Sequence, residues 1–222
     1  MRFLCSIVLA LFFALQGGVV AAETPDFDET KQLAEQGNAG AQLNLGVMYE
    51  NGDGVPQDFK EAVKWYRLAA AQGYAPAQYN LGFMYAQGHG VPQDTKESLK
   101  WHRLAADQGN EFAQINLGVA YVIGSGVPQD YKEALKWYRL AADQGNGYAQ
   151  YSLGYMYFIG NGVPQDDTIS HMWYDISAIN GYADSVEARD SMEKFMTADS
   201  ITKAQEMARV CLGSDYRDCG GK

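Results

Sequence analysis

Ser200 and Lys203 are the residues in this sequence whose types and spacing come closest to a catalytic pattern. They match S-x-x-K, in which a serine is the nucleophile and a lysine lies one helical turn away. The companion S-D-N and K-T-G motifs are absent from the sequence, and so is a pattern typical of the α/β scaffold that carries them. We therefore interpret this segment as the start of a helix and expect a protein that is not an enzyme.

The three histidines, His89, His102 and His171, could in principle bind a metal or transfer protons. No two of them lie at metal-ligand spacing, and no HExxH motif is present. His102 and His171 instead read as substitutions at positions that recur in an internal repeat. We expect no metal ion and no other cofactor.

Cys211 and Cys219 are the cysteines that remain once Cys5, in the apolar N-terminal segment, is set aside. An even number of cysteines in an exported chain favours a disulfide, and two reduced thiols are the alternative. The sequence has no CxxC motif, so redox catalysis is not expected.

Residues 1–22 have the pattern of a secretory signal peptide. A positive start is followed by an almost entirely apolar run, residues 3–15, and then by small residues up to Ala22. The run is shorter than the roughly 20 residues that a membrane-spanning helix needs. We expect cleavage after Ala22 and a periplasmic or secreted protein without a stable membrane anchor; a retained anchor is the alternative. The net charge of −10 disfavours a nucleic-acid partner.

An internal repeat of 36 residues dominates the rest of the chain. The tetrapeptide Val-Pro-Gln-Asp recurs in phase with a tryptophan, a Leu-Gly pair and a glycine. The four copies of the tetrapeptide begin at Val55, Val91, Val127 and Val163. Such regularity is typical of stacked structural units that each contact only their neighbours.

Each unit reads as two helices. In the first unit, Ala41, Leu45 and Tyr49 share one helical face, and Gly46 beside them suggests the close approach of a neighbour. The glycine-rich run 51–54 ends this helix.

The second helix of the unit begins at Asp58, which forms a capping-box pattern with Glu61. A buried stripe follows at Ala62, Trp65, Tyr66 and Ala69. After the repeats, Thr197 is expected to cap a last helix that runs to about Leu212 and stops at Gly213.

The sequence therefore predicts an all-α fold, a solenoid of stacked antiparallel helix pairs. Its expected parts are a signal peptide (1–22), an N-terminal half-repeat (23–40), four repeats (41–76, 77–112, 113–148, 149–184) and a C-terminal helical cap (185–222).

The repeat resembles that of the Sel-one-like family, the longer relative of the tetratricopeptide repeat, and the C-terminal stretch looks like that of exported bacterial members. The second unit carries the resemblance at Ala77, Leu81-Gly82, Tyr85, Gly88, Gly90-Val91, Gln93-Asp94, Trp101, Ala105-Ala106 and Gly109. The resemblance implies a right-handed α-solenoid with a concave binding surface and a role as an adaptor or scaffold. A cysteine-rich secreted branch of the family binds or hydrolyses β-lactams, and we keep this as the alternative function, although this chain lacks that branch's cysteine pair in each repeat.

Positions that vary between repeats indicate where a protein or peptide partner could bind. On the first helices they lie at i, i+4 and i+7, so they share a face that is rich in aromatic residues. Aromatic rings provide contact area, and asparagine amides can bind a peptide backbone. Alternatively, these side chains pack repeat against repeat. The predicted partner-binding residues are Tyr79, Asn80, Phe83, Asn116, Tyr151, Tyr155 and Phe158.

The second helices offer another candidate surface, a basic stripe. Its members are Lys60, Lys64 and Arg67 and their equivalents in the next two repeats, Lys96, Lys100, Arg103, Lys132, Lys136 and Arg139. Most charged stripes on helices are only solvated faces, which is the alternative interpretation here.

Overall fold

The computed structural model describes residues 26–219, and the expected signal peptide lies outside this range. The described residues form eleven α-helices and no strand, which confirms the predicted all-α solenoid. The helices are α1 (Phe27–Glu35), α2 (Ala39–Asn51), α3 (Phe59–Ala71), α4 (Ala75–Gln87), α5 (Thr95–Asp107), α6 (Glu111–Ile123), α7 (Tyr131–Ala142), α8 (Gly147–Ile159), α9 (Asp167–Ile179), α10 (Asp184–Glu193) and α11 (Ala198–Gly213).

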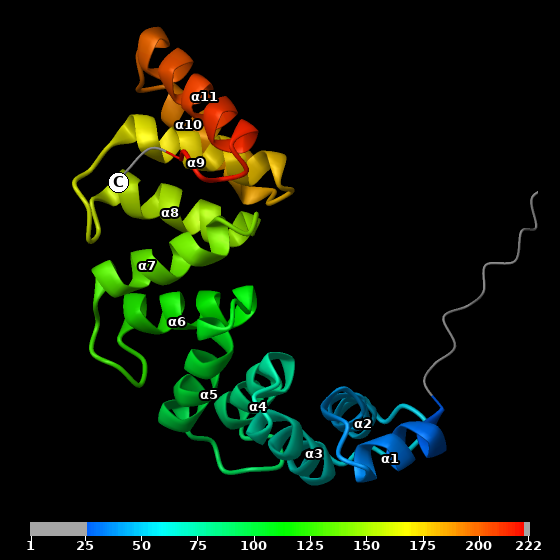
Figure 1. The fold of residues 1–222 in the computed structure, drawn as a ribbon. Helices are drawn as coiled ribbons and strands as arrows, with labels where there is room; N and C mark the ends of the chain where they lie inside the picture. The colour runs from blue at the N-terminus through cyan, green and yellow to red at the C-terminus, as the bar shows by residue number, and fades with distance from the viewer. Residues whose placement is uncertain (1–25, 220–222) are drawn as a thin grey trace, which may run out of the picture.

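The helices follow one another along an open arc (Figure 1). Four pairs, α2–α3, α4–α5, α6–α7 and α8–α9, form the repeats, and the second helix of each pair also packs on the first helix of the next. We call the first helix of a pair the A helix and the second the B helix. At the ends, α1 stands in the place of a B helix, and α10 packs on α9 as a further A helix would.

The Val-Pro-Gln-Asp tetrapeptide joins the two helices of a repeat. The Gln57 side chain donates a hydrogen bond of 2.8 Å to the carbonyl of Glu50 in the last turn of α2. Asp58 then caps α3 by accepting hydrogen bonds from the backbone N–H groups of Lys60 and Glu61. The loop therefore satisfies backbone groups at the end of one helix and at the start of the next.

The capping box predicted at Asp58 and Glu61 forms only in part. The backbone N–H of Asp58 donates to the carbonyl of Tyr49 at 2.8 Å, so it is not available to Glu61. The Glu61 carboxylate instead pairs with Lys64 at 3.0 Å. The aspartate cap is confirmed, and the second half of the predicted motif is wrong because the tight loop has already used its donor.

The repeated mid-helix glycine does allow a close approach, as predicted. A Cβ atom at Gly46 would lie 2.5 Å from the Tyr66 ring, which packs directly on the backbone of α2. In the next repeat the imidazole of His102 takes the same place over Gly82. The neighbour at each glycine is therefore a ring from the B helix of the same repeat.

Buried amides link consecutive repeats. The Gln42 side chain donates to the carbonyl of Ala34 at the end of α1 and accepts a hydrogen bond of 2.7 Å from Gln72 at the end of α3. The same pair of bonds recurs in each later repeat, with Asn180 in the role of Gln72 in the last one. This ladder explains why the glutamine recurs at a position that the structure buries.

The C-terminal cap covers the last repeat. Both α10 and α11 pack on α9, and every residue from 170 to 177 is buried. Thr197 caps α11 as predicted, and α11 ends at Gly213, within one residue of the predicted Leu212. The left-handed residues after the helix are Asp215 and Tyr216, whose φ angles are 54° and 62°.

The two remaining cysteines meet at the end of this cap. The sulfur atoms of Cys211 and Cys219 lie within bonding distance, and their Cα atoms are 4.4 Å apart, within the range of disulfides. The Arg139 guanidinium on α7 donates to the carbonyl of Cys219, so the tail reaches back to the preceding repeat.

Candidate functional site

The predicted aromatic residues of α4 and α8 lie at the molecular surface. Phe83, Tyr155 and Phe158 are 37%, 49% and 42% exposed, and Tyr79 and Tyr151 are half-buried. We call the surface formed by the variable positions of the A helices the A-helix face. Its aromatic residues occur in two groups, one on α4 and one on α8.

The α4 group is small. The Tyr79 ring lies 5.6 Å from the His102 imidazole and 6.0 Å from the Phe112 ring, and burial raises the pKa of Tyr79. Phe83 has the His89 ring edge-on at 6.4 Å. Tyr79 is thus partly a packing residue, whereas Phe83 presents its ring to solvent.

The two predicted asparagines lie at the seam between repeats. Asn80 lies close to the hydroxyl of Tyr66, which donates to Glu50, and the Asn116 amide nitrogen is 3.4 Å from Nε2 of His102. Both side chains are half-buried. Each amide carries further hydrogen-bonding positions beyond these single contacts.

The α8 group is larger than the sequence predicted. The Tyr151 ring lies 5.4 Å from Tyr174 and 5.1 Å from Tyr182, and Tyr182 lies 5.7 Å from Tyr148. Tyr182 was missed because it lies in the loop between α9 and α10, outside any helix-face pattern. Tyr148 could have been found, since Phe112 occupies the same place one repeat earlier.

The basic stripe on the B helices is largely occupied by contacts within the protein. Lys64, Lys100 and Lys136 each pair with a glutamate one turn earlier. Arg67 and Arg103 donate to the hydroxyls of tyrosines on the next A helix, Tyr85 and Tyr121, at 2.8 and 2.6 Å, and Arg139 lies over the Trp173 ring. The arginines therefore contact neighbouring repeats as well as solvent.

Ser200 lies in the first turn of α11, where the sequence placed it. Its backbone N–H donates to the Thr197 hydroxyl at 3.2 Å, and the two hydroxyl oxygens are 3.0 Å apart. The Lys203 side chain is exposed. These contacts are those of a capped helix N-terminus.

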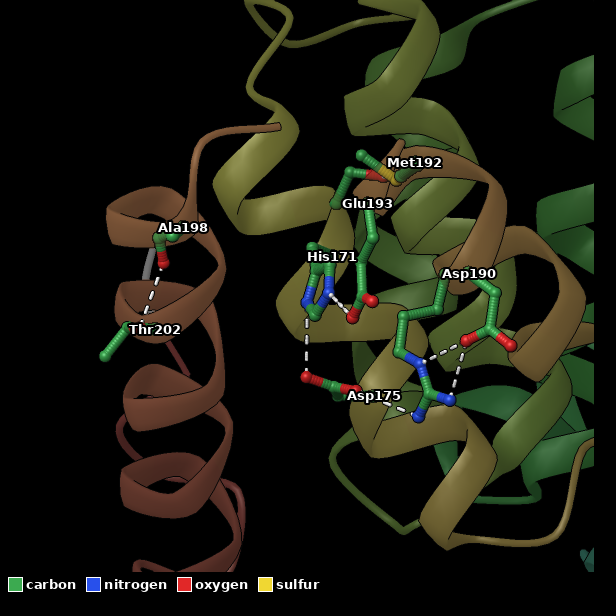
Figure 2. Close-up of polar contacts among 9 residues, drawn as sticks. His171, Asp175, Asp190, Met192, Glu193, Ala198 and Thr202 are labelled. Atoms are coloured by element: carbon green, nitrogen blue, oxygen red, sulfur yellow. Dashed lines mark hydrogen bonds and ion pairs between the residues drawn. The ribbon is translucent and has the colours of Figure 1, made fainter. Parts of the chain in front are cut away.

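His171 is the most connected of the histidines (Figure 2). It is fully buried, with Nδ1 3.2 Å from Asp175 and Nε2 2.9 Å from Glu193 of α10. Arg189 of α10 also contacts Asp175, at 3.3 Å. Burial lowers the pKa of His171, but the neighbouring carboxylates of Asp175 and Glu193 outweigh it, so the pKa is raised.

His102 has the opposite environment. It is buried against uncharged side chains, and this burial lowers its pKa to about 4. Within residues 26–219, no group of three or more His, Cys, Asp or Glu side chains is arranged to hold a metal ion. In the same range, no helix is both long and apolar enough to cross a membrane.

Solved structures of other repeat proteins resemble this one. A protective antigen from uropathogenic Escherichia coli strains is 44% identical and superposes with a TM-score of 0.75, covering 87% of this chain and 41% of the antigen. A Sel1 repeat protein from Oxalobacter formigenes is 39% identical with a TM-score of 0.69, covering 73% of this chain and 47% of the relative. This chain thus spans less than half of the length of either protein. A comparison with curated proteins found no match.

The Sel1 repeat family model matches the chain at residues 39–74, 75–110, 112–146 and 147–182, which together make up more than half of it. Each matched segment contains one A helix and one B helix. Proteins with these repeats generally mediate protein–protein interactions, and their fold typically serves as a non-catalytic scaffold. With four matching repeats stacked as a helical solenoid, this chain belongs to the Sel1 repeat family.

Proposed function

We propose that this protein binds a peptide segment of another protein along the A-helix face. The observation that carries the proposal is the exposure of Phe83, Tyr155 and Phe158 at the surface of the solenoid. Clustered aromatic residues at a surface are typical of protein interaction sites, where they supply most of the contact area.

Comparison between the repeats supports a role for these rings other than packing. Phe83 and Tyr155 stand where the other two repeats have Val47 and Val119. The recurring leucines, such as Leu81, are completely buried and already fill the space between the helices. A valine is therefore sufficient at these positions, and the larger rings are available to a ligand.

The proposal is tested with peptides selected on the immobilised protein from a random-peptide library. Phe83→Ala and Tyr155→Ala should each weaken binding of the selected peptides about thirtyfold, the loss expected when an aromatic hot spot worth about 2 kcal/mol is truncated. Charge reversal of Lys100 and Lys136 on the B helices is the control and should change affinity little. Circular dichroism should show unchanged helical content in all four variants.

Three results would contradict the proposal. One is that the lysine reversals abolish binding while the aromatic truncations do not, which would make the basic stripe the docking surface. Another is that the truncations unfold the protein, which would make the rings packing residues. The third is that no peptide is selected that depends on Phe83 or Tyr155.

We also propose that the protein works outside the cytoplasm, in the periplasm or as a secreted protein. The signal-peptide pattern up to Ala22 and the disulfide geometry of Cys211 and Cys219 support this. Protein isolated from its native compartment should begin at Glu23 in mass spectrometry, and its cysteines should react with iodoacetamide only after reduction. An intact N-terminus in the cytoplasm, or freely reactive thiols, would contradict the proposal.

A further inference from the structure

The A-helix face changes its chemistry where it reaches α10. Asp184 lies 36 residues after Tyr148, and Glu187 lies 36 residues after Tyr151. Helix α10 packs on α9 in the same way that α8, the preceding A helix, packs on α7. The two carboxylates therefore occupy the places that tyrosines have one repeat earlier. The face therefore ends in a row of tyrosines followed directly by two acids.

The tyrosine rings at this end form an open cluster. Tyr182 lies 5.7 Å from Tyr148 with the ring planes at 78°, and 5.1 Å from Tyr151 with the planes at 48°. Tyr148 is 38% exposed, and Tyr155, one turn after Tyr151 on α8, is 49% exposed. An aromatic ring carries a negative face and a positive edge, so the exposed ring faces of Tyr148 and Tyr155 can attract a cation.

The electrostatic potential at the cluster is negative. Burial raises the pKa of Tyr151, and the charges of Asp184 and Glu187 raise it further. Burial and then the Asp184 carboxylate likewise raise the pKa of Tyr182. Both carboxylates are exposed, and neither forms an ion pair with any residue in the range 26–219.

Neither α8 nor α10 supplies a free cation to this site. Helix α8 carries no charged residue. On α10, Arg189 is held by Asp175 and Asp190. Lys194 comes ten residues after Asp184, about 15 Å further along the helix direction. The negative potential is thus left for a ligand.

We propose that the end of the A-helix face formed by Tyr148, Tyr151, Tyr155, Tyr182, Asp184 and Glu187 binds an arginine side chain of the partner segment. A guanidinium can stack on a tyrosine face and donate hydrogen bonds to a carboxylate at the same time, which the more compact lysine ammonium does less well. This inference rests on the proposed function for its choice of partner, a peptide lying along the same face. The binding of the cation itself can be measured independently.

The test uses N-acetylarginine amide and its neutral isostere N-acetylcitrulline amide, titrated into the whole protein while the tyrosine ring signals are followed by NMR. Arginine should shift the signals of the cluster and bind about fivefold more tightly than citrulline, as a cation–π contact together with an exposed ion pair predicts. The double variant Asp184→Asn, Glu187→Gln should lose this preference. The control variant Asp107→Asn, Glu206→Gln removes the same amount of charge from α5 and α11 and should still prefer arginine to citrulline.

The inference is overturned if citrulline binds as well as arginine, if neither shifts the cluster, or if the control variant loses the preference as fully as the double variant. Should the double variant misfold, Glu187→Gln alone must still reduce the preference. Selected peptides that depend on Phe83 but not on an arginine would leave the proposed function intact and refute this inference. If arginine binds but no peptide is selected, this inference stands and the proposed function is refuted.

Discussion

His102 stands where three other repeats have Tyr66, Tyr138 and Tyr174, and its burial introduces a dependence on pH that tyrosine does not. In the folded protein its pKa is about 4, below the ordinary value of 6.5. Between pH 4 and pH 6.5, His102 is therefore mostly protonated in unfolded chains and mostly neutral in folded chains. The stability that the neutral imidazole contributes is complete above pH 6.5 and is lost as the pH falls toward 4.

We predict that His102→Tyr makes the protein less sensitive to acid. The tyrosine ring should pack on Gly82 as Tyr66 packs on Gly46, and it carries no charge in either state. Urea unfolding at pH 8 and pH 5 should show a drop in free energy of unfolding that is about 2 kcal/mol smaller in the variant than in the parent protein. Equal drops in the two proteins would show that His102 is not the group responsible.

His171 should have the opposite effect, because its pKa is raised. The charged imidazole binds Asp175 on α9 and Glu193 on α10, with Arg189 as the other cation at Asp175. A base with a raised pKa stabilises the fold fully below its unfolded value of 6.5 and progressively less as the pH rises through the raised value.

We predict that α10 opens more readily as the pH rises above about 6.5, the ordinary histidine pKa. Hydrogen exchange of α10 amides, corrected for the intrinsic pH dependence, should increase over this range. Helix α2, which lies far from α9 and α10 along the arc, serves as the internal control (Figure 1). In His171→Gln, exchange should be fast at every pH and the pH dependence should disappear. A pH dependence that survives in this variant would refute the assignment.

At the residue scale, the sequence was informative only where the repeat pattern extends. His102 could be read as a replacement for a ring because three other repeats show the ring. The contact of His171 with Glu193 could not be predicted, because Glu193 belongs to α10, whose sequence lacks the repeat motif. The contacts of the B-helix arginines could not be predicted either, because the repeat pattern does not indicate which aromatic ring lies beneath each guanidinium.

At the scale of the helix, the repeated glycine can be tested directly. Gly118→Ala places a Cβ atom 2.6 Å from the Tyr138 ring, so the ring or the helix must move. We predict that this variant is destabilised by about 1–3 kcal/mol in urea unfolding, although alanine favours helix.

The matched control for this prediction is Gly213→Ala in α11, where nothing lies within 4 Å of the new atom. This change should be neutral or stabilising by up to about 1 kcal/mol. If both alanines stabilise the protein, the ring contact in α6 does not require glycine.

Helix ends were predictable where a single side chain determines them. The aspartate of each Val-Pro-Gln-Asp motif does cap a B helix, and Thr197 caps α11. The Glu61 partner was not predictable, because the loop backbone had used the donor at Asp58. The end of α11 at Gly213 was predictable to within one residue, whereas the chain reversal after it, where the Cys211 carbonyl accepts from the backbone N–H of Tyr216, was not.

At the scale of the molecule, the fold was predictable because the same contacts recur every 36 residues. The packing of the C-terminal cap was not, since this part of the chain departs from the repeat. Instead of extending the solenoid from α10, helix α11 lies on α9 and buries Ile176, whose equivalents Leu68, Leu104 and Leu140 remain exposed. Asp184 and Glu187 keep the 36-residue register of Tyr148 and Tyr151, but the repeat motif around them is lost.

The last prediction concerns the solenoid as a modular array and uses a variant that lacks one whole repeat, residues 77–112. Joining Pro76 to Ala113 brings α3 against α6 in the register that α4 had. Gln114 can then replace Gln78 as donor to the Ala70 carbonyl, and Tyr121 can replace Tyr85 as acceptor for Arg67, so each contact at the new seam has a precedent.

We expect the shortened protein to fold cooperatively, with a urea m-value lower by about one fifth because less surface is exposed on unfolding. It should lose the Phe83 part of the A-helix face and keep the arginine preference of the α8–α10 end. Deletion of 77–94, which removes one helix and breaks the register, is the control and should not fold cooperatively. If both deletions unfold the chain, contacts beyond neighbouring repeats hold the solenoid together, and the nearest-neighbour description of its stability is wrong.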